Sequence, residues 1–328
     1  MTTRTTTIPE TGSALDHTEL VVTHREDVAD RIVAFELQRA DGAPLPEWGP
    51  GAHIDVRMPN GLERQYSLCG DPADRGRCRI AVLLERDGTG GSAFMHESVH
   101  VGDSVLVTGP RNHFRLREAA GYHFIAGGIG VTAILPMVAS ADARGVPWTL
   151  SYLGRSRSSM AFIDELARYG DHVTVLAADE VPRALISDLV AGVAEGELVY
   201  ACGPERLLRD LEEIMTDEAG HRLEVERFAP KDPGVLTEQG TTFAVALAQS
   251  GITVDVPPGT SILSAVEEAG VDAAYSCREG TCGTCETRIL SGIADHRDSI
   301  LSPDEQEANE TVMICVSRSK TPLLELDL

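Results

Sequence analysis

Four of the seven cysteines lie in the last quarter of the chain, and their spacing predicts a redox metal centre. Three lie in one segment as Cys-x4-Cys-x2-Cys, and the fourth lies far downstream. This is the plant-type pattern for a [2Fe–2S] cluster, in which four thiolates hold two irons. Structural zinc sites favour paired Cys-x2-Cys motifs, and only one such pair is present. We therefore expect a [2Fe–2S] cluster with the ligands Cys277, Cys282, Cys285 and Cys315.

A glycine-rich turn, Gly127-Gly128-Ile-Gly130-Val-Thr132, follows an apolar segment and precedes a helical pattern. Such a turn can hold a pyrophosphate at a helix N-terminus, although a plain tight turn would have the same composition. The acid that ordinarily follows the next strand is replaced by Arg155-Ser-Arg157. These arginines either pair with ribose or phosphate oxygens or are solvated residues of a loop.

The tripeptide Cys202-Gly203-Pro204 follows another predicted strand. Ligands of parallel sheets bind at the carboxyl ends of strands, so this tripeptide is a candidate contact for a coenzyme. A buried cysteine before a turn is the alternative interpretation.

A cation, an aromatic ring and a hydroxyl follow one another in Arg64-Gln65-Tyr66-Ser67, on a predicted strand. Arg64 and Tyr66 share one face of that strand, and Ser67 points to the other. Downstream, Gly90-Gly91-Ser92 is expected to form a flexible loop rich in hydrogen-bond donors. Together these residues can hold a phosphorylated planar cofactor, but a surface strand and a hairpin turn would also explain them.

The composition excludes several classes of function. The chain has 328 residues with 28 Lys and Arg against 51 Asp and Glu, a net charge of −23. Such an acidic protein repels nucleic acid and anionic membranes. The uncharged stretch 121–141 contains several glycines and a proline, which favour a buried strand, turn and helix over a membrane span. The absence of a signal-peptide pattern and the odd number of cysteines predict a cytoplasmic protein without a disulfide framework.

Three rhythms of secondary structure divide the chain. Short strands broken by Gly and Pro come first and predict an antiparallel barrel or sandwich, of which we expect the barrel. Strand–helix alternation follows and predicts a parallel α/β sheet. A third unit begins after Ala-Pro-Lys-Asp-Pro-Gly, which is the best linker candidate. The expected boundaries are a flexible N-terminus at 1–17, the barrel at 18–116, the α/β domain at 117–229, the linker at 230–240 and the cluster domain at 241–328. The predicted strands are 19–23, 31–37, 53–58, 64–69, 78–84, 104–108, 123–126, 148–153, 172–176, 198–202 and 243–247, and the predicted helices are 131–141, 161–169, 184–189, 205–215 and 261–269.

Taken in order, these motifs resemble the phthalate dioxygenase reductase family, within the ferredoxin–NADP reductase superfamily. The resemblance covers roughly residues 18–328. It rests on Arg-x-Tyr-Ser, Gly-Gly-Ser, the glycine turn, Cys-Gly-Pro, the four cysteines and Glu226-Arg-Phe228 near the end of the second domain. Each motif is ordinary alone, but six in this order are specific. The resemblance implies a flavin barrel, an NAD-binding α/β domain and a β-grasp ferredoxin domain.

The resemblance also implies cofactors and roles for residues. The flavin is FMN rather than FAD, Phe228 lies against its ring, and Cys202 lies near the nicotinamide. Ser67, Cys202 and Phe228 are the implied catalytic residues. The implied cofactor contacts are Arg64, Gln65, Tyr66, Ser67, Gly90, Gly91, Ser92, Gly127, Gly128, Gly130, Thr132, Arg155, Cys202, Gly203, Pro204 and Phe228. NADH is the coenzyme of the subfamily, and the arginines at 155 and 157 keep NADPH open.

The expected function is electron transfer from NADH through FMN and the [2Fe–2S] cluster to a terminal oxygenase. The expected partner is a Rieske aromatic-ring hydroxylase or O-demethylase, and a haem-thiolate monooxygenase is the alternative. A non-catalytic electron carrier would not need the intact glycine turn and Cys-Gly-Pro. A self-sufficient oxygenase would need an active-site metal, and the histidines show no suitable spacing for one. A flavin is needed because a nicotinamide does not readily deliver single electrons.

Overall fold

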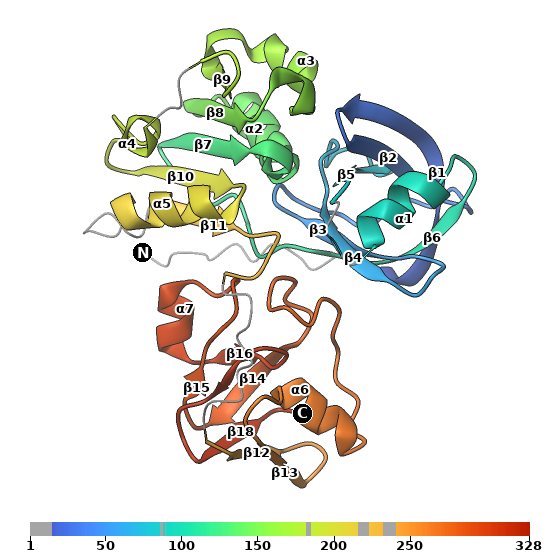
Figure 1. Ribbon diagram of the computed structural model, residues 1–328, viewed down its shortest axis with the longest axis vertical. Coiled ribbons are helices and arrows are strands. Elements are labelled where there is room, and N and C mark those ends of the chain that lie inside the picture. Colours follow the sequence, from blue (N-terminus) through green and yellow to red (C-terminus); the bar gives the residue numbers. More distant parts are fainter. Residues whose placement is uncertain (1–14, 86–87, 89, 182–184, 216–222, 232–240) are drawn as a thin grey trace, which may run out of the picture.

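The computed structural model describes residues 15–85, 88, 90–181, 185–215, 223–231 and 241–328. Figure 1 shows three lobes that follow one another along the chain. The first strand begins at Leu15, so the last three residues of the segment 1–17, which was predicted to be flexible, belong to a strand. Residues 1–14 of that segment, and residues 232–240 of the predicted linker, lie outside the described residues.

The first lobe is a six-stranded antiparallel barrel with the strand order β4-β3-β6-β1-β2-β5. All six predicted strands are part of it. Apolar side chains from the strands and from one helix fill its interior, including Val22, Phe35, Ile80 and Met95. The elements are β1 (Leu15–Ala29), β2 (Ile32–Arg39), β3 (His53–Arg57), β4 (Glu63–Ser67), β5 (Cys78–Leu83), α1 (Gly91–Ser98) and β6 (Ser104–Arg111).

The second lobe is a parallel sheet with the order β11-β10-β7-β8-β9. Its strands are β7 (Gly121–Gly127), β8 (Trp148–Gly154), β9 (Val173–Ala177), β10 (Glu197–Cys202) and β11 (Leu223–Glu226). Its helices are α2 (Val131–Ala143), α3 (Ile163–Leu166), α4 (Ile186–Leu189) and α5 (Glu205–Met215), with short 3-10 turns η1 (Gly128–Gly130), η2 (Arg157–Ser159) and η3 (Ala167–His172).

The helices of this lobe match the predictions where the apolar spacing is helical. In α5, Leu207, Leu208, Leu211 and Met215 are buried and recur on one face of the helix. The helix predicted at 161–169 is instead the four-residue α3 followed by 3-10 turns, with Gly170 in a non-helical conformation. The apolar spacing continues through Leu166 and Tyr169, but the backbone of Gly170, with φ 54° and ψ −128°, is not helical.

The third lobe is a mixed sheet with the order β13-β12-β18-β14-β16, in which β12 and β18 run parallel. Helix α6 packs into its core through Ile262, Leu263 and Val266, as in a β-grasp fold. The elements are β12 (Phe243–Leu247), β13 (Ile252–Val256), α6 (Ile262–Glu268), β14 (Glu286–Ser291), β15 (Ala294–Asp295), α7 (Pro303–Ala308), β16 (Thr311–Met313), β17 (Arg318–Ser319) and β18 (Leu323–Leu326).

The lobes differ in how they are joined. Barrel residues such as Ile32, Ala34 and Ala81 belong to the same apolar cluster as Phe124 and Val131 of the second lobe. The apolar cluster of the third lobe contains only residues from 243 onward. No helix in the described part of the chain is long and apolar enough to cross a membrane.

A buried arginine holds the third lobe together. Arg318 is 3% exposed and donates to the carbonyl oxygens of Thr260 at 2.8 Å, Pro257 at 3.2 Å and Thr241 at 3.2 Å. Its guanidinium also lies 4.9 Å from the centre of the Phe243 ring. Arg318 therefore holds the backbone before β12, at Thr241, to the backbone after β13, at Pro257 and Thr260.

Arg318→Ala removes these donors and leaves buried carbonyl groups without partners. We expect a loss of about 3 kcal/mol in the stability of the third lobe, since each unsatisfied buried group costs about 1–3 kcal/mol. Thermal unfolding followed by calorimetry measures it. Arg288→Ala, which changes an exposed arginine on β14 of the same lobe, is the control and should shift the melting temperature little. Equal shifts for both variants would show that the network is dispensable.

Candidate functional site

Strand β4 and the start of α1 form one candidate anion site on the barrel. A Cβ atom added at Gly91 would lie 2.8 Å from Cγ of Arg64, so the start of the helix and this arginine are in close contact. Gly90, before the helix, has a left-handed φ of 91°. The backbone N–H groups at a helix start and a guanidinium both favour an anion. Residues 90–92 are not the flexible loop that their composition predicts, since α1 begins at Gly91, where Gly90 turns the chain into the helix.

Three buried polar atoms near β4 have no hydrogen-bond partner among the described residues. They are the hydroxyl of Tyr66, the hydroxyl of Ser67 and the indole Nε1 of Trp48. Burial raises the pKa of Tyr66, so its hydroxyl stays protonated as a donor. Unpaired buried donors cost free energy unless a ligand satisfies them. The donor set and the adjacent anion site fit a flavin, which has a ring with N and O acceptors and a phosphate. Gln65 is half-buried on the same strand, opposite Asp55 in the register.

Two loops meet at the centre of the parallel sheet. Strand β7 leads to β8 and β9 on one side, and β10 and β11 lie on its other side. This reversal of direction is the switch point where parallel sheets bind ligands. The loops after β7 and β10 therefore bring the glycine turn and Cys202-Gly203-Pro204 together.

The glycines in these loops are needed for the contact between the loops. A Cβ atom at Gly130 would lie 2.2 Å from the carbonyl oxygen of Cys202, and one at Gly127 would lie 2.6 Å from Cδ of Pro204. A Cβ atom at Gly203 would lie 2.9 Å from Cα of Gly127. Gly128 differs, because it has a left-handed φ of 54° and nothing within 4 Å of its Cβ position. Gly128 is thus the position where the turn is open to a ligand.

Thr132 and the two loop arginines have protein contacts of their own. The hydroxyl of Thr132 is buried and donates to the carbonyl oxygen of Ile129 at 2.9 Å, which closes the turn. Arg157 is exposed and its Nε donates to Glu180 at 3.1 Å. Arg155 is exposed on the loop after β8. The structure thus gives Thr132 and Arg157 roles within the fold.

A buried carboxyl lies beside Cys202, and its burial was not predicted from the sequence. Glu226 is the register partner of Cys202 in the β10–β11 ladder. Its Oε2 is buried without a hydrogen-bond partner among the described residues, and burial raises its pKa to about 8. Burial, and then Glu226, raise the pKa of the Cys202 thiol well above its usual value. The signal was present in the sequence as the acid of Glu226-Arg-Phe228.

Arg227, which lies between Glu226 and Phe228, fixes the end of β11 to α5. The Arg227 side chain is 4% exposed, and it donates to Glu205 at 2.9 Å and to Glu212 at 2.7 Å. Phe228, which follows, is 45% exposed although it is a large apolar residue. Arg227 therefore holds Glu226 and Phe228 in place next to the switch point.

The four predicted ligand cysteines lie together in the third lobe. The backbone N–H of Cys277 donates to Sγ of Cys282 at 3.5 Å. The neighbouring thiols lower the pKa of Cys277, through Cys282 and Cys315, and the pKa of Cys285, through Cys315. The backbone N–H of Glu279 also donates to Sγ of Cys277 at 3.3 Å. No group of three or more His, Cys, Asp or Glu side chains among the described residues has the geometry for a metal ion. The fit to a cluster thus rests on four adjacent thiols with a backbone donor aimed at sulfur.

Two glycines shape the loop around these thiols. Gly280 and Gly283 have left-handed φ values of 71° and 75°. A Cβ atom at Gly280 would lie 2.6 Å from Cγ2 of Val316, beside the fourth cysteine. The loop can therefore wrap closely around the thiols only with glycine at these positions.

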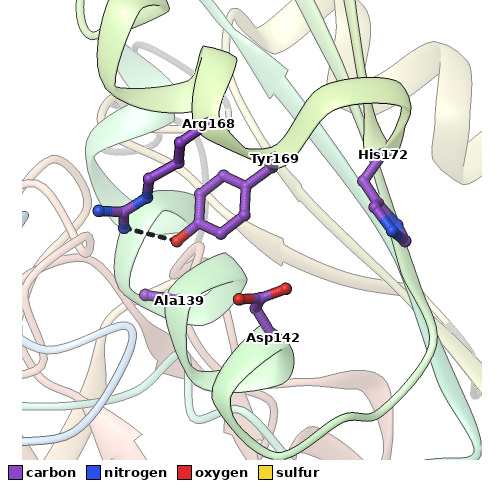
Figure 2. Close-up of a pocket in the computed structure, with 5 residues that line it drawn as sticks. All are labelled: Ala139, Asp142, Arg168, Tyr169 and His172. Atoms are coloured by element: carbon purple, nitrogen blue, oxygen red, sulfur yellow. Dashed lines mark hydrogen bonds between the residues drawn. The ribbon is translucent and has the colours of Figure 1, made fainter.

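A separate pocket of about 520 Å³ lies in the second lobe, lined by Ala139, Asp142, Arg168, Tyr169 and His172 (Figure 2). His172 directly precedes β9, so this pocket is at the amino end of that strand, whereas the two loops follow the carboxyl ends of β7 and β10. None of the predicted site residues lines it. The Arg168 guanidinium donates to the Tyr169 hydroxyl at 2.6 Å, as Figure 2 shows.

Two family models match the chain. Residues 19–116 match the oxidoreductase FAD-binding domain, and residues 245–320 match the 2Fe-2S iron-sulfur cluster binding domain. Phenoxybenzoate dioxygenase subunit beta of Ectopseudomonas oleovorans is 44% identical over 302 residues, which are 92% of this chain and 94% of that protein. The carnitine monooxygenase reductase subunit of Escherichia coli is 38% identical over 94% of this chain and 98% of its own length.

Solved structures agree with these relatives. Phthalate dioxygenase reductase is 35% identical with a TM-score of 0.69, and the match covers 96% of this chain and 98% of that one. A type IV self-sufficient cytochrome P450 monooxygenase is 42% identical with a TM-score of 0.90 over 95% of this chain, which spans 41% of that longer protein. The chain belongs to the phthalate dioxygenase reductase family, and it is an oxidoreductase with a flavin-binding domain and a [2Fe–2S] ferredoxin domain.

Proposed function

We propose that this protein is the NADH-oxidising reductase of an oxygenase system and that it uses FMN and a [2Fe–2S] cluster. The observation that carries the proposal is the set of unpartnered buried donors on β4, next to an anion site, in a chain that also brings four thiols together. When bound, the flavin links the two-electron chemistry of a nicotinamide to the one-electron chemistry of the cluster. We infer a cytoplasmic location from the sequence pattern.

Arg64 and the start of α1 are proposed to hold the FMN phosphate. The Tyr66 and Ser67 hydroxyls then donate to the ring, and exposed Phe228 covers it from the side of the second lobe. This site favours FMN over FAD, because FMN ends in a phosphate monoester, which is more negatively charged than either phosphate within the pyrophosphate of FAD and makes stronger charge-assisted contacts. The family model that matches the barrel is named for FAD binding, so the affinities for FMN and FAD need to be compared.

Gly128 is proposed to face the pyrophosphate of NADH, since it alone among the three glycines of the turn has open space at its Cβ position. Cys202 and Glu226 then line the nicotinamide site at the switch point. The engagement of Arg157 with Glu180 removes one cation from a 2′-phosphate, which favours NADH over NADPH. The exposed Arg155 leaves the alternative coenzyme to be tested directly by kinetics.

The terminal acceptor is proposed to be a Rieske-type oxygenase, by analogy with the phthalate and phenoxybenzoate enzymes whose subunits resemble this chain. The similarity to a self-sufficient cytochrome P450 supports the second candidate, a haem-thiolate monooxygenase. Steady-state reduction of purified acceptors of both classes by this protein and NADH separates the two candidates.

Arg64→Ala should weaken FMN binding roughly ten- to a hundredfold, since a charge-assisted contact is worth about 1.5–3 kcal/mol. Fluorescence titration of flavin-free protein measures the dissociation constants of FMN and FAD. Arg57→Ala, an exposed arginine on neighbouring β3, is the control. FMN affinity that is unchanged in the Arg64 variant would remove this residue from the site, and tighter binding of FAD would correct the flavin.

Cys277→Ser should remove iron and acid-labile sulfide and abolish transfer to the oxygenase. NADH oxidation with ferricyanide should persist, because the coenzyme and flavin sites lie in the other two lobes. Cys78→Ala, which changes a buried cysteine in the barrel core, should retain full iron content. A Cys277 variant that keeps its iron would exclude this residue as a ligand.

Glu226→Gln should change the pH dependence of stability. The pKa of Glu226 in the folded protein, about 8, exceeds its ordinary value of 4.5, so its contribution to stability is full below about pH 4.5 and is lost as the pH rises through about 8. The variant should therefore gain melting temperature relative to the natural protein between pH 5 and 8 and keep a constant gain above pH 8. Glu268→Gln, which changes the exposed last residue of α6, is the control. Parallel pH profiles would show that Glu226 is not buried as a free acid.

A further inference from the structure

The cysteine loop of the third lobe packs against the flavin barrel. The His113 ring, just after β6, occupies the space beside Gly283, where an added Cβ would lie 2.2 Å from His113 Nε2. The His113 ring in turn stacks on His53 of β3, with centroids 6.0 Å apart and planes 24° apart. The loop that carries three of the four cysteines therefore lies directly on a surface of the barrel.

An ion pair of the barrel reaches the loop at the same place. Asp55 of β3 and Arg111 at the end of β6 form a salt bridge, and the Asp55 side chain is only 2% exposed. The hydroxyl of Thr284 donates to Asp55 Oδ2 at 3.5 Å and lies 3.2 Å from Cys282 Sγ. A single side chain, Thr284, therefore contacts both the barrel carboxylate and a predicted ligand sulfur.

This interface contains more buried polarity than its hydrogen bonds satisfy. Asp55 Oδ1, Arg111 Nε and both ring nitrogens of His53 are buried without a partner among the described residues. Burial lowers the pKa of Arg111, and the nearby thiols of Cys282 and Cys277 oppose that change. A buried ion pair adds little stability compared with an apolar contact of the same shape.

We propose that Asp55 is a positioning residue for the [2Fe–2S] cluster, which holds the Thr284 hydroxyl through its carboxylate and lowers the reduction potential of the cluster with its charge. The Thr284 hydroxyl has one proton, so a bond to Asp55 keeps that proton from Cys282 Sγ. Hydrogen bonds to sulfur and nearby positive charge raise the potential of such clusters. Arg111 offsets the charge of Asp55 and fixes the orientation of its carboxylate. The proposal rests on the four cysteines being the cluster ligands.

The test is a redox titration of the full-length holoprotein, followed by the electron paramagnetic resonance signal of the reduced cluster. Asp55→Asn keeps the size of the side chain, removes its charge and frees the Thr284 proton for sulfur, so the potential should rise. Asp55→Asn/Arg111→Gln also removes the opposing charge, so its potential should return toward that of the natural protein. Damage to the structure would instead add up in the double variant.

The control is a second partly buried ion pair that involves the barrel, Arg79–Glu165, at 3.0 Å. It joins the barrel to the second lobe, so Glu165→Gln and Glu165→Gln/Arg79→Gln should leave the cluster potential unchanged. A potential in Asp55→Asn equal to that of the natural protein would overturn the proposal. A double variant shifted further than the single one would do the same.

Thr284→Val and Thr284→Ser test the contact from the other lobe without changing any charge. In stopped-flow experiments with NADH, Thr284→Val should slow reduction of the cluster, because the loop loses its hydrogen bond to Asp55 of the barrel. Flavin reduction should keep its natural rate in this variant. Thr284→Ser keeps the hydroxyl, so its rate of cluster reduction should equal that of the natural protein. Equal rates of cluster reduction in all three proteins would refute the positioning role. The ligand assignment is judged separately, because it depends on the iron content of Cys277→Ser and this proposal depends on potentials and rates.

Discussion

The apolar cluster shared by the barrel and the parallel-sheet lobe is the contact on which the arrangement of the site depends. Ile32 and Ala81 of the barrel pack in one continuous core with Phe124 and Val131, so the two lobes cannot separate without exposing that core to water. Arg79 adds a salt bridge to Glu165 and lies 4.8 Å from the centre of the Phe162 ring. The flavin and coenzyme sites proposed above would therefore be held at a constant separation.

The third lobe follows a different rule. Its core is closed on itself, and the contacts described between it and the rest are polar and small, such as Thr284 with Asp55 and Lys231 N–H with Ser299 at 2.9 Å. A ferredoxin domain with its own core can fold on one side of such an interface without help from the other. The position of the third lobe relative to the barrel thus depends on a few hydrogen bonds and charges, among them Asp55 and its partner Arg111.

Much of the fold was predictable because its signals are local. Short β-type segments between Gly and Pro identified all six barrel strands, and the described part of α5, Glu205–Met215, matches the predicted helix. Helix α1 was missed because Gly90-Gly91-Ser92 has the composition of a turn, and only the left-handed backbone of Gly90 converts it to a helix start. Glu226 was quoted from the sequence only as part of a motif and Asp55 was not named, since their importance comes from burial beside groups distant in sequence, which no spacing rule encodes.

The backbone contact between the loops after β7 and β10 also bears on how this protein can change over time. Because Gly127, Gly130 and Gly203 have no room for a β-carbon, nearly every random substitution there deforms the switch point instead of adjusting it. Selection for another coenzyme therefore has to act elsewhere, and the exposed loop that carries Arg155 and Arg157 accepts new side chains without strain. The same sheet can then evolve in its preference for a coenzyme while its catalytic centre stays fixed.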